Sequence, residues 1–219
     1  MSFDPSLQFE SFQPCPLLAP VPAVLISCAG QDGKPNLITI AWAGTVCSDP
    51  PMVQISVRKE RYSYGLIRET GEFVINLVGT KQAWATDYCG VKSGRDVDKF
   101  AQCQLTPISA PPLFHAPAVG ECPAHMMCKV EQVIPLGSHD LFLARVVGVR
   151  VQKSLLDEKG SLHLERAGLV CYNHGVYQAA GEVLGFFGYS VAGEKVLKSR
   201  MAAYRTAKEK FDPKERKKK

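Results

Sequence analysis

The sequence lacks the common motifs by which proteins hold a nucleotide or activate a nucleophile. No Gly-x-Gly-x-x-Gly follows a strand candidate, so a Rossmann dinucleotide site is unsupported. There is no Gly-x-x-x-x-Gly-Lys phosphate loop, no His-Glu-x-x-His zinc motif and no Gly-x-Ser-x-Gly nucleophile elbow. A nucleotide that binds to this chain must therefore be held by another arrangement.

Long apolar runs are also missing. The longest, Leu17 to Ile26, spans ten residues, is interrupted by Pro20 and Pro22, and is too short to cross a bilayer. The first residues include Asp4 and Glu10 but no Lys or Arg, so the basic region of a signal peptide is absent. We expect a cytoplasmic protein with no membrane partner.

The eight cysteines include no Cys-x-x-Cys pair, which argues against a zinc ribbon or a thioredoxin-type motif. The tightest spacing, Cys122 and Cys128 with His125 between them, lacks the matching second pair of a tetrahedral zinc site. A chain of this length without a secretory signal does not need disulfides to build a core. We predict no metal site and mostly buried, reduced thiols.

Basic residues are scarce in the body of the chain. The net charge of +5 arises because residues 194–219 hold eleven Lys/Arg and four Asp/Glu, which leaves fifteen basic and seventeen acidic residues elsewhere. A nucleic-acid-binding domain would spread its positive charge over the body. We therefore expect no nucleic-acid partner and interpret 212–219 as a solvated tail. The expected division is a domain at 1–193 followed by a C-terminal helix and tail at 194–219.

Short strand candidates are what the sequence does contain. Each is rich in β-branched or apolar residues and is bounded by Gly, Pro, Asn or Asp. Gly30–Gly33 is a turn between the first two, which form an expected hairpin. The candidates are 22–29, 36–47, 52–57, 72–78, 128–135, 141–152 and 168–172.

Helical patterns are fewer. Tyr62 to Glu69 has helical character and stops before Gly71, a plausible C-cap. Residues 80–102 are expected to hold helical turns and a loop, and 194–211 repeats apolar residues along one helical face. Together, these strand and helix candidates predict a mainly β protein, either a barrel or a sandwich, with a few peripheral helices and a C-terminal helix.

One continuous block has the composition of a mononucleotide site. A strand that ends in Thr45-Val-Cys-Ser48 before a Pro pair leaves backbone groups without ladder partners, and its small side chains let a flat ring approach. Arg58, Lys59 and Arg61 then precede a hydroxyl residue and a helix start. Arginine guanidinium groups, a hydroxyl group and the N–H groups at a helix N-terminus can together bind a phosphate.

These residues resemble the FMN-binding split-barrel flavin reductases, and within them the flavoredoxin-like branch. The resemblance runs from about residue 15 to about 180 and rests on several motifs in order. They are Pro22-Ala-Val-Leu-Ile-Ser27 before a Gly-Lys-Pro-Asn turn, Ala41-Trp42 to Pro51, Gly71-Glu-Phe-Val-Ile-Asn-Leu77, Ser93-Gly-Arg-Asp-Val-Asp-Lys-Phe100 and Gly137-Ser-His139.

The resemblance implies a six-stranded Greek-key split barrel and a homodimer with FMN near the subunit interface. It places Thr45, Val46, Cys47 and Ser48 against the edge of the flavin ring. The phosphate would meet Arg58, Arg61 and Ser63, with Tyr62 and Ser93 beside them. The residues implied to surround the ring are Asn36, Trp42, Lys99, Tyr172 and His139, the last as the catalytic candidate.

Structural interpretations of the same residues stay open at this point. Trp42 is ordinarily a core aromatic, Asn36 a turn residue and Lys99 a solvated helix residue, while His139 at a strand turn can simply hydrogen-bond to backbone. A positive charge at Lys99 near the ring would stabilise the anionic reduced flavin.

The resemblance implies an FMN-dependent oxidoreductase that uses NAD(P)H or a redox protein as its electron donor. The alternatives are a pyridoxamine-phosphate-oxidase-like enzyme on the same barrel and a flavin-binding protein without redox chemistry. The sequence does not decide the donor or the acceptor, FMN against FAD, or NADH against NADPH. It also leaves open whether flavin is a prosthetic group or a substrate, and the roles of the cysteines and the tail.

Overall fold

The structure, a computed structural model, describes residues 6–211, with side chains described up to residue 204. The basic tail expected at 212–219 lies outside these residues. Seven strands form the main sheet, in the order β3-β2-β6-β9-β10-β5-β4, and every neighbouring pair is antiparallel. Their bounds are β2 (Val24–Ala29), β3 (Pro35–Ile40), β4 (Ala43–Ser48), β5 (Pro51–Arg58), β6 (Glu72–Leu77), β9 (Ala124–Pro135) and β10 (His139–Val151).

The two edges of this sheet are joined by only two residues. β3 and β4 are the two edge strands of the sheet, yet only Ala41 and Trp42 separate them in the chain. The Ser56 N–H on β5 donates to the Trp42 carbonyl over 2.9 Å. The sheet must therefore curl until its two edges come close at this bend, as in a barrel that stays open between β3 and β4.

The expected mainly β class is confirmed, and two details of it differ. The prediction of a single strand at 36–47 is wrong, because the chain bends at Ala41–Trp42 and passes from one edge of the sheet to the other. The main sheet has seven strands rather than six, since that bend divides one expected strand into β3 and β4.

β2 is buried on both faces, which explains its unbroken apolar sequence. Alternate side chains of a strand point to opposite faces. Val24 and Ile26 belong to the cluster that includes Phe73 and Phe142, whereas Leu25 packs with residues of the helices outside the sheet. The strand thus separates the barrel interior from a second core under the helices.

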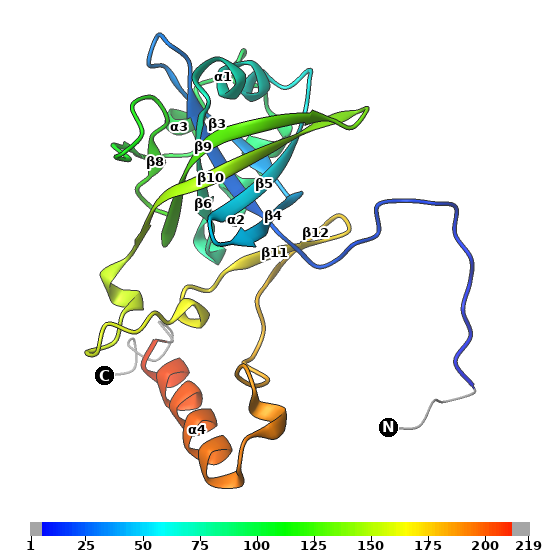
Figure 1. Ribbon diagram of the computed structural model, residues 1–219, viewed down its shortest axis with the longest axis vertical. Helices are drawn as coiled ribbons and strands as arrows, with labels where there is room; N and C mark the ends of the chain where they lie inside the picture. The colour runs from blue at the N-terminus through cyan, green and yellow to red at the C-terminus, as the bar shows by residue number, and fades with distance from the viewer. Residues whose placement is uncertain (1–5, 212–219) are drawn as a thin grey trace.

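Short helices pack against both of these cores: Ile67 of the first helix belongs to the cluster of Val24 and Phe142, whereas the next two helices contribute Ala85, Cys89 and Phe100 to the cluster of Leu25. α1 (Tyr62–Thr70) follows β5 and ends at Gly71, whose φ of 68° is the left-handed conformation expected of a C-cap glycine. α2 (Ala83–Val91) follows a 3-10 turn, η1 (Thr80–Gln82), and α3 (Lys99–Gln102) begins at the capping residue Asp98. α4 (Glu194–Phe211) spans the residues predicted for the C-terminal helix and lies apart from the barrel in Figure 1.

A smaller three-stranded sheet lies beside the barrel (Figure 1). It consists of β1 (Val21–Pro22), β11 (Val170–Asn173) and β12 (Val176–Ala179) in the order β1-β11-β12. β11 is held to the barrel by its Val170 N–H, which donates to the Val78 carbonyl over 3.0 Å. A further pair, β7 (Pro107–Ile108) with β8 (Ala118–Val119), lies in the proline-rich connector.

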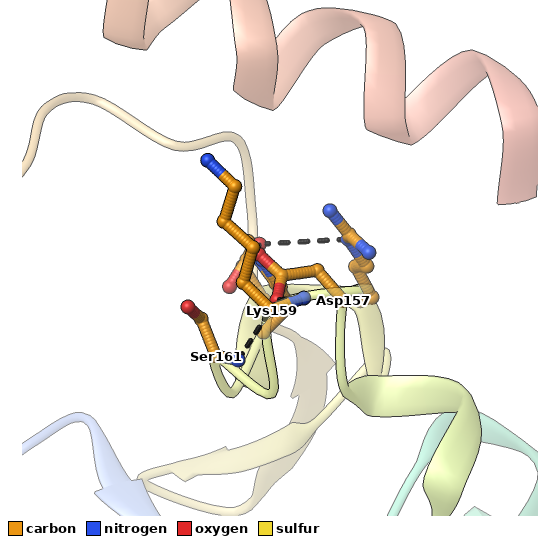
Figure 2. Close-up of polar contacts among 6 residues, drawn as sticks. Asp157, Lys159 and Ser161 are labelled. Carbon is orange, nitrogen blue, oxygen red and sulfur yellow. Dashed lines mark hydrogen bonds and ion pairs between the residues drawn. The ribbon is translucent and has the colours of Figure 1, made fainter.

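A tight turn orders the connection between β10 and β11. Asp157 follows the turn η2 (Lys153–Leu155), and its Oδ1 accepts the N–H groups of Lys159 over 2.9 Å and Ser161 over 2.8 Å (Figure 2). Its Oδ2 lies 3.2 Å from Nε2 of His163, whose Nδ1 lies 2.8 Å from Oε1 of Glu165 in the turn η3 (Leu164–Arg166). α4 contacts η3.

The N-terminal segment, residues 6–20, has no helix or strand and runs away from the sheet in Figure 1. Its large apolar side chains are all more than half exposed. They are Leu7, Phe9, Phe12, Leu17 and Leu18. The segment before α4, with its turn η4 (Tyr189–Val191), exposes Leu184, Phe187 and Val191 in the same way.

Candidate functional site

Two adjoining cavities lie where β3, β5 and the helices meet. We call the first the basic cavity, and its volume is about 340 Å³. The second, the aromatic cavity, is about 410 Å³. Ile38, Arg58 and Arg61 line both, so the two cavities form one continuous site.

The basic cavity is strongly cationic. Its single carboxylate, Glu60, is already paired with Arg58 at 3.2 Å. Its five basic residues are Arg58, Arg61, Lys92, Arg95 and Lys99. Such a surplus of positive charge suits a phosphate or another multiply charged anion.

The N-terminus of α1 opens into the basic cavity. The cap residue Arg61 and the first two helical residues, Tyr62 and Ser63, all line it. No side chain caps this helix end, and its first turn contains no acidic residue. Uncapped N–H groups and the positive end of the helix dipole favour an anion here.

Asn36 on β3 and Ser63 on α1 form the floor of the basic cavity. Asn36 Nδ2 donates to Ser63 Oγ over 2.7 Å, and both residues are buried. Gly94 passes so close above Asn36 that an added Cβ would lie 2.0 Å from Asn36 Oδ1 and 2.9 Å from Cδ1 of Tyr62. The loop between α2 and α3 therefore needs a glycine at this position.

Lys99 brings a buried cation to the cavity wall. The Asp98 side chain accepts the Ala101 N–H over 3.1 Å and so fixes the start of α3. Lys99 Nζ donates to the carbonyls of Leu37 and Cys89, each over 2.8 Å. Burial lowers the pKa of Lys99, and the charge of Arg61 lowers it further. Among residues 6–204, whose side chains the structure describes, no carboxylate pairs with it.

Arg95 closes the cavity from the loop side. Its Nη1 donates to the Glu60 carbonyl over 3.1 Å, and its guanidinium lies 5.4 Å from the centre of the Tyr62 ring. This cation–π contact and hydrogen bond hold the loop against the start of α1.

Trp42 and His139 form one wall of the aromatic cavity. Their ring centres are 4.5 Å apart, and Trp42 is 43% exposed, so it is not a core residue. Ser138 Oγ lies 2.9 Å from His139 Nδ1 and restrains the imidazole. Burial lowers the pKa of His139, and the nearby Arg58 lowers it further, which favours the neutral form of the ring.

The opposite wall comes from the small sheet. Tyr172 on β11 and Tyr177 on β12 have ring centres 5.4 Å apart in an edge-to-face arrangement, and both line the aromatic cavity. Burial raises the pKa of Tyr177 to about 12, with the nearby Asp87 of α2 contributing both its charge and a hydrogen bond. Asp87 of α2 and Tyr177 of the hairpin β11–β12 thus line the same cavity.

The structure brings together most of the residues singled out in the sequence. Those in the basic cavity are Asn36, Arg58, Arg61, Tyr62, Ser63, Ser93 and Lys99. Those in the aromatic cavity are Trp42, Arg58, Arg61, His139 and Tyr172. Asn36 and Lys99, expected around a ring, thus lie in the basic cavity with the residues expected around a phosphate.

Thr45, Val46, Cys47 and Ser48 line neither cavity. They lie on β4, which pairs only with β5 in the part of the chain that the structure describes. A register shift between Thr45 and Cys47 marks a β-bulge, and Val46 is 52% exposed. The free backbone edge expected from the sequence is present, because β4 is the last strand of the sheet.

The sequence reasoning missed Lys92, Arg95, Asp87 and Tyr177. Arg95 lies within the motif Ser93–Phe100, so the sequence did contain a signal for it, although only Ser93 and Lys99 were predicted from that motif. Asp87 and Tyr177 carry no local signal, because helix α2 and strand β12 meet only through the tertiary fold.

Comparison with known proteins decides the family. The sequence pattern of the flavin reductase like domain matches residues 18–180. The chain belongs to this family. The resemblance to the flavin reductases and their flavoredoxin-like branch is thereby confirmed, together with the split barrel and a flavin-binding, oxidoreductase assignment.

Solved structures of flavoredoxins superpose well on this chain. The flavoredoxin of Desulfovibrio vulgaris (Miyazaki F) has a TM-score of 0.76 and 32% identity, over 82% of this chain and 97% of that one. The flavoredoxin of Methanosarcina acetivorans has a TM-score of 0.73 and 25% identity, over 84% and 100% of the two chains.

Sequence relatives include the reductase component of a 4-nitrophenol 4-monooxygenase/4-nitrocatechol 2-monooxygenase from Rhodococcus opacus. It is 30% identical over 57% of this chain and 63% of that protein. A NADPH-flavin oxidoreductase of Streptomyces viridifaciens is 27% identical over 65% and 75% of the two chains. Among residues 6–211, no helix is both long and apolar enough to span a membrane.

Proposed function

We propose that this protein is an FMN-dependent oxidoreductase whose basic cavity holds the flavin phosphate and whose aromatic cavity holds the ring. The observation that supports it is the continuity of the two cavities, one cationic and one aromatic, through Arg58 and Arg61. A mononucleotide carries an anionic end and a flat aromatic end, so it matches both halves at once.

The residues of the basic cavity fit a phosphate. Arg61 offers a guanidinium fork and has no carboxylate partner in the described part of the chain, and the uncapped amides of α1 lie beside it. Ser63 is held in place by Asn36, and Lys99 adds charge from the wall. These groups bind and orient the anionic end without any phosphate-loop motif.

The ring half requires a flat opening with donors at its edge. Trp42 and Tyr172 supply the aromatic walls, and Ser56 adds a hydroxyl group to the lining. The edge of β4 at Thr45–Ser48 lies outside this cavity, so its contact with a ring stays a prediction of the family resemblance. Bound FMN would supply reversible acceptance of a hydride or of electrons. The lowered pKa of His139 favours the neutral ring, which can hydrogen-bond to a ligand in this cavity without adding charge.

We propose NAD(P)H as the electron donor, in preference to a redox protein. Flavin-dependent relatives are named as a reductase component and as a NADPH-flavin oxidoreductase. The aromatic cavity of about 410 Å³ is the larger of the two and is bounded by Tyr172, Tyr177 and His139, so it offers a wall against which a nicotinamide ring can lie.

We also propose a homodimer. The N-terminal segment 6–20 and the segment before α4 expose large apolar side chains that no described part of the chain covers. Contiguous exposed apolar surface of this kind marks an interaction site. The segment 6–20 leads directly into β1, which belongs to the sheet that walls the aromatic cavity, so a second copy of the chain would meet the site there.

The decisive experiment is spectroscopic. The purified protein should carry a yellow flavin chromophore, release FMN rather than FAD on denaturation, and bleach when NADH or NADPH is added without oxygen. A protein that cannot be reconstituted with micromolar FMN would contradict flavin binding. One that binds FMN but does not bleach with either nucleotide would point to a protein donor or to a non-redox role.

A further inference from the structure

Two cysteine thiols face each other directly behind the basic cavity. Cys89 lies on α2 and Cys103 follows α3, and their Sγ atoms are 3.8 Å apart within one buried cluster. Cys89 is fully buried, whereas Cys103 is partly exposed. For a disulfide to form, the Sγ–Sγ distance must shorten from 3.8 Å to about 2.05 Å.

The same two residues anchor the cation of the cavity wall. The Cys89 carbonyl accepts a hydrogen bond from Lys99 Nζ over 2.8 Å, and the Cys103 N–H donates to the Lys99 carbonyl over 3.0 Å. The chain between them, 90–102, includes Lys92, Gly94 and Arg95, which line the basic cavity. A bond between the thiols would therefore close a loop that carries one side of the site.

We propose that Cys89 and Cys103 form a thiol–disulfide exchange site that reacts with small disulfides and closes into an intramolecular disulfide. The partly exposed Cys103 reacts first. Its thiolate, after losing a proton to solvent, attacks one sulfur of the small disulfide, whose S–S bond breaks and releases one thiolate. The deprotonated Cys89 then attacks Cys103 Sγ and displaces the second thiolate. Two protein thiols are oxidised and one small disulfide is reduced to two thiols.

The burial of the two thiols makes this exchange slow. Burial raises the pKa of both thiols, that of Cys89 to about 12, so the fraction of reactive thiolate at neutral pH is small. The neighbouring charge of Lys99 opposes that shift at both sulfurs. Cys122 also belongs to the cluster and is fully buried, but no S–S contact joins it to Cys89 or Cys103 among the hydrogen bonds described.

A metal does not account for the cluster. Within residues 6–211, no group of three or more His, Cys, Asp or Glu side chains is arranged to hold a metal ion.

Closure of the disulfide would restrain the loop before a ligand binds. Such preorganisation reduces the ordering that binding requires, so an anion in the basic cavity should leave more slowly. This consequence rests on the proposed flavin function, whereas the disulfide itself does not.

The test uses the full-length protein incubated with oxidised glutathione, followed by peptide mapping without reductant. We expect a Cys89–Cys103 peptide pair that is two hydrogen atoms lighter than the reduced form, and its loss on addition of dithiothreitol. In the Cys89→Ser variant the reaction should stop at the mixed disulfide between glutathione and Cys103. The Cys103→Ser variant should form neither this adduct nor the Cys89–Cys103 link. Cys15→Ser, which removes an exposed thiol far along the chain, is the matched control and should leave the link intact.

The outcomes separate the two parts of the proposal. A Cys103–Cys122 link, or a persistent adduct on Cys103 in the unmodified chain, would overturn the assignment of the pair. With the link formed, the dissociation rate of FMN should fall by at least about threefold. A link without any change in that rate would refute the coupling, and a chain that links but never binds FMN would refute the flavin function while leaving the thiol site intact.

Discussion

Asn36 Nδ2 donates to Ser63 Oγ over 2.7 Å and joins β3 to the first turn of α1 at the floor of the basic cavity. Both residues are buried, so the pair is structural as well as part of the site. Ser63→Ala should therefore reduce the free energy of unfolding by about 1–3 kcal/mol, because it leaves the buried amide of Asn36 without this partner. Urea denaturation measures the loss.

A double-mutant cycle provides the control for this pair. If this hydrogen bond is what Ser63→Ala removes, the substitution should lower the free energy of unfolding clearly less in an Asn36→Ala background than in the wild-type protein. Additive effects in the cycle would show that Ser63 contributes through another contact.

Gly94→Ala should disturb the site without removing any polar group. Its Cβ would lie 2.0 Å from Asn36 Oδ1, so either Asn36 or the loop at 92–98 must move. We expect at least about tenfold weaker FMN binding, measured by fluorescence quenching, because a displacement of the loop removes phosphate contacts.

Gly65→Ala is the matched control for that change. Gly65 lies on α1, and an added Cβ there meets no atom within 4 Å. The substitution should raise helix stability by about 0.5–1 kcal/mol and leave FMN affinity unchanged. Equal effects of the two alanines on affinity would contradict the role assigned to Gly94.

Arg61→Ala should weaken FMN binding by about ten- to hundredfold, since a charge-assisted hydrogen bond contributes roughly 1.5–3 kcal/mol. Arg61 is half-buried at the N-terminus of α1 and lines both cavities. Arg68→Ala, an exposed arginine near the other end of the same helix, serves as the control and should leave affinity unaltered. An unchanged dissociation constant for Arg61→Ala would place the phosphate elsewhere.

His163 should make the stability of the connection at 153–167 depend on pH. Hydrogen bonds to Glu165 and Asp157 raise the pKa of His163 above its ordinary value of 6.5. A raised native pKa means that the folded state binds the proton more tightly, so the stabilisation is fully present below pH 6.5 and is lost as pH rises through the native pKa.

The comparison of the wild-type protein with His163→Gln measures this effect. The difference in unfolding free energy should be larger near pH 5.5 than near pH 8.5, and the imidazole should titrate above 6.5 by NMR. A difference that grows with rising pH would contradict the sign.

Removal of residues 1–20 should convert the proposed dimer into a monomer. The segment 6–20 exposes five large apolar side chains and is long enough to extend roughly 50 Å, so it can reach across a second copy. Light scattering should fall from about twice the chain mass to the chain mass of 24.0 kDa.

Removal of residues 212–219 is the control for this deletion. The sequence places that segment after Phe211, the last apolar residue of the helical stripe, and its lysines can bury little. We expect this deletion to preserve both the dimer and FMN binding. A full-length protein of 24 kDa in solution would rule out the dimer itself.

Local patterns were sufficient to predict several features of this protein. The β-branched runs predicted most of the strands, Gly71 predicted the end of α1, and the apolar repeat predicted α4 at 194–211. The block from Arg58 to Ser63 indicated cationic side chains gathered at a helix start, and these residues do line the basic cavity together. That an anion binds there stays a prediction. Each of these depends on residues that are close together in the chain.

The tertiary structure alone decided how those pieces combine. The strand expected at 36–47 satisfies strand preferences throughout, and only the meeting of two sheet edges at Ala41–Trp42 divides it. Lys99 looks like an exposed helix residue in the sequence, yet the packing of α3 against β3 buries it against two carbonyls. The aromatic cavity joins Trp42, His139 and Tyr177 from three distant segments. The sequence by itself determined the local elements and the cationic side chains at the start of α1. The depth and the neighbours of the site arise from contacts over long sequence separations, which no local pattern encodes.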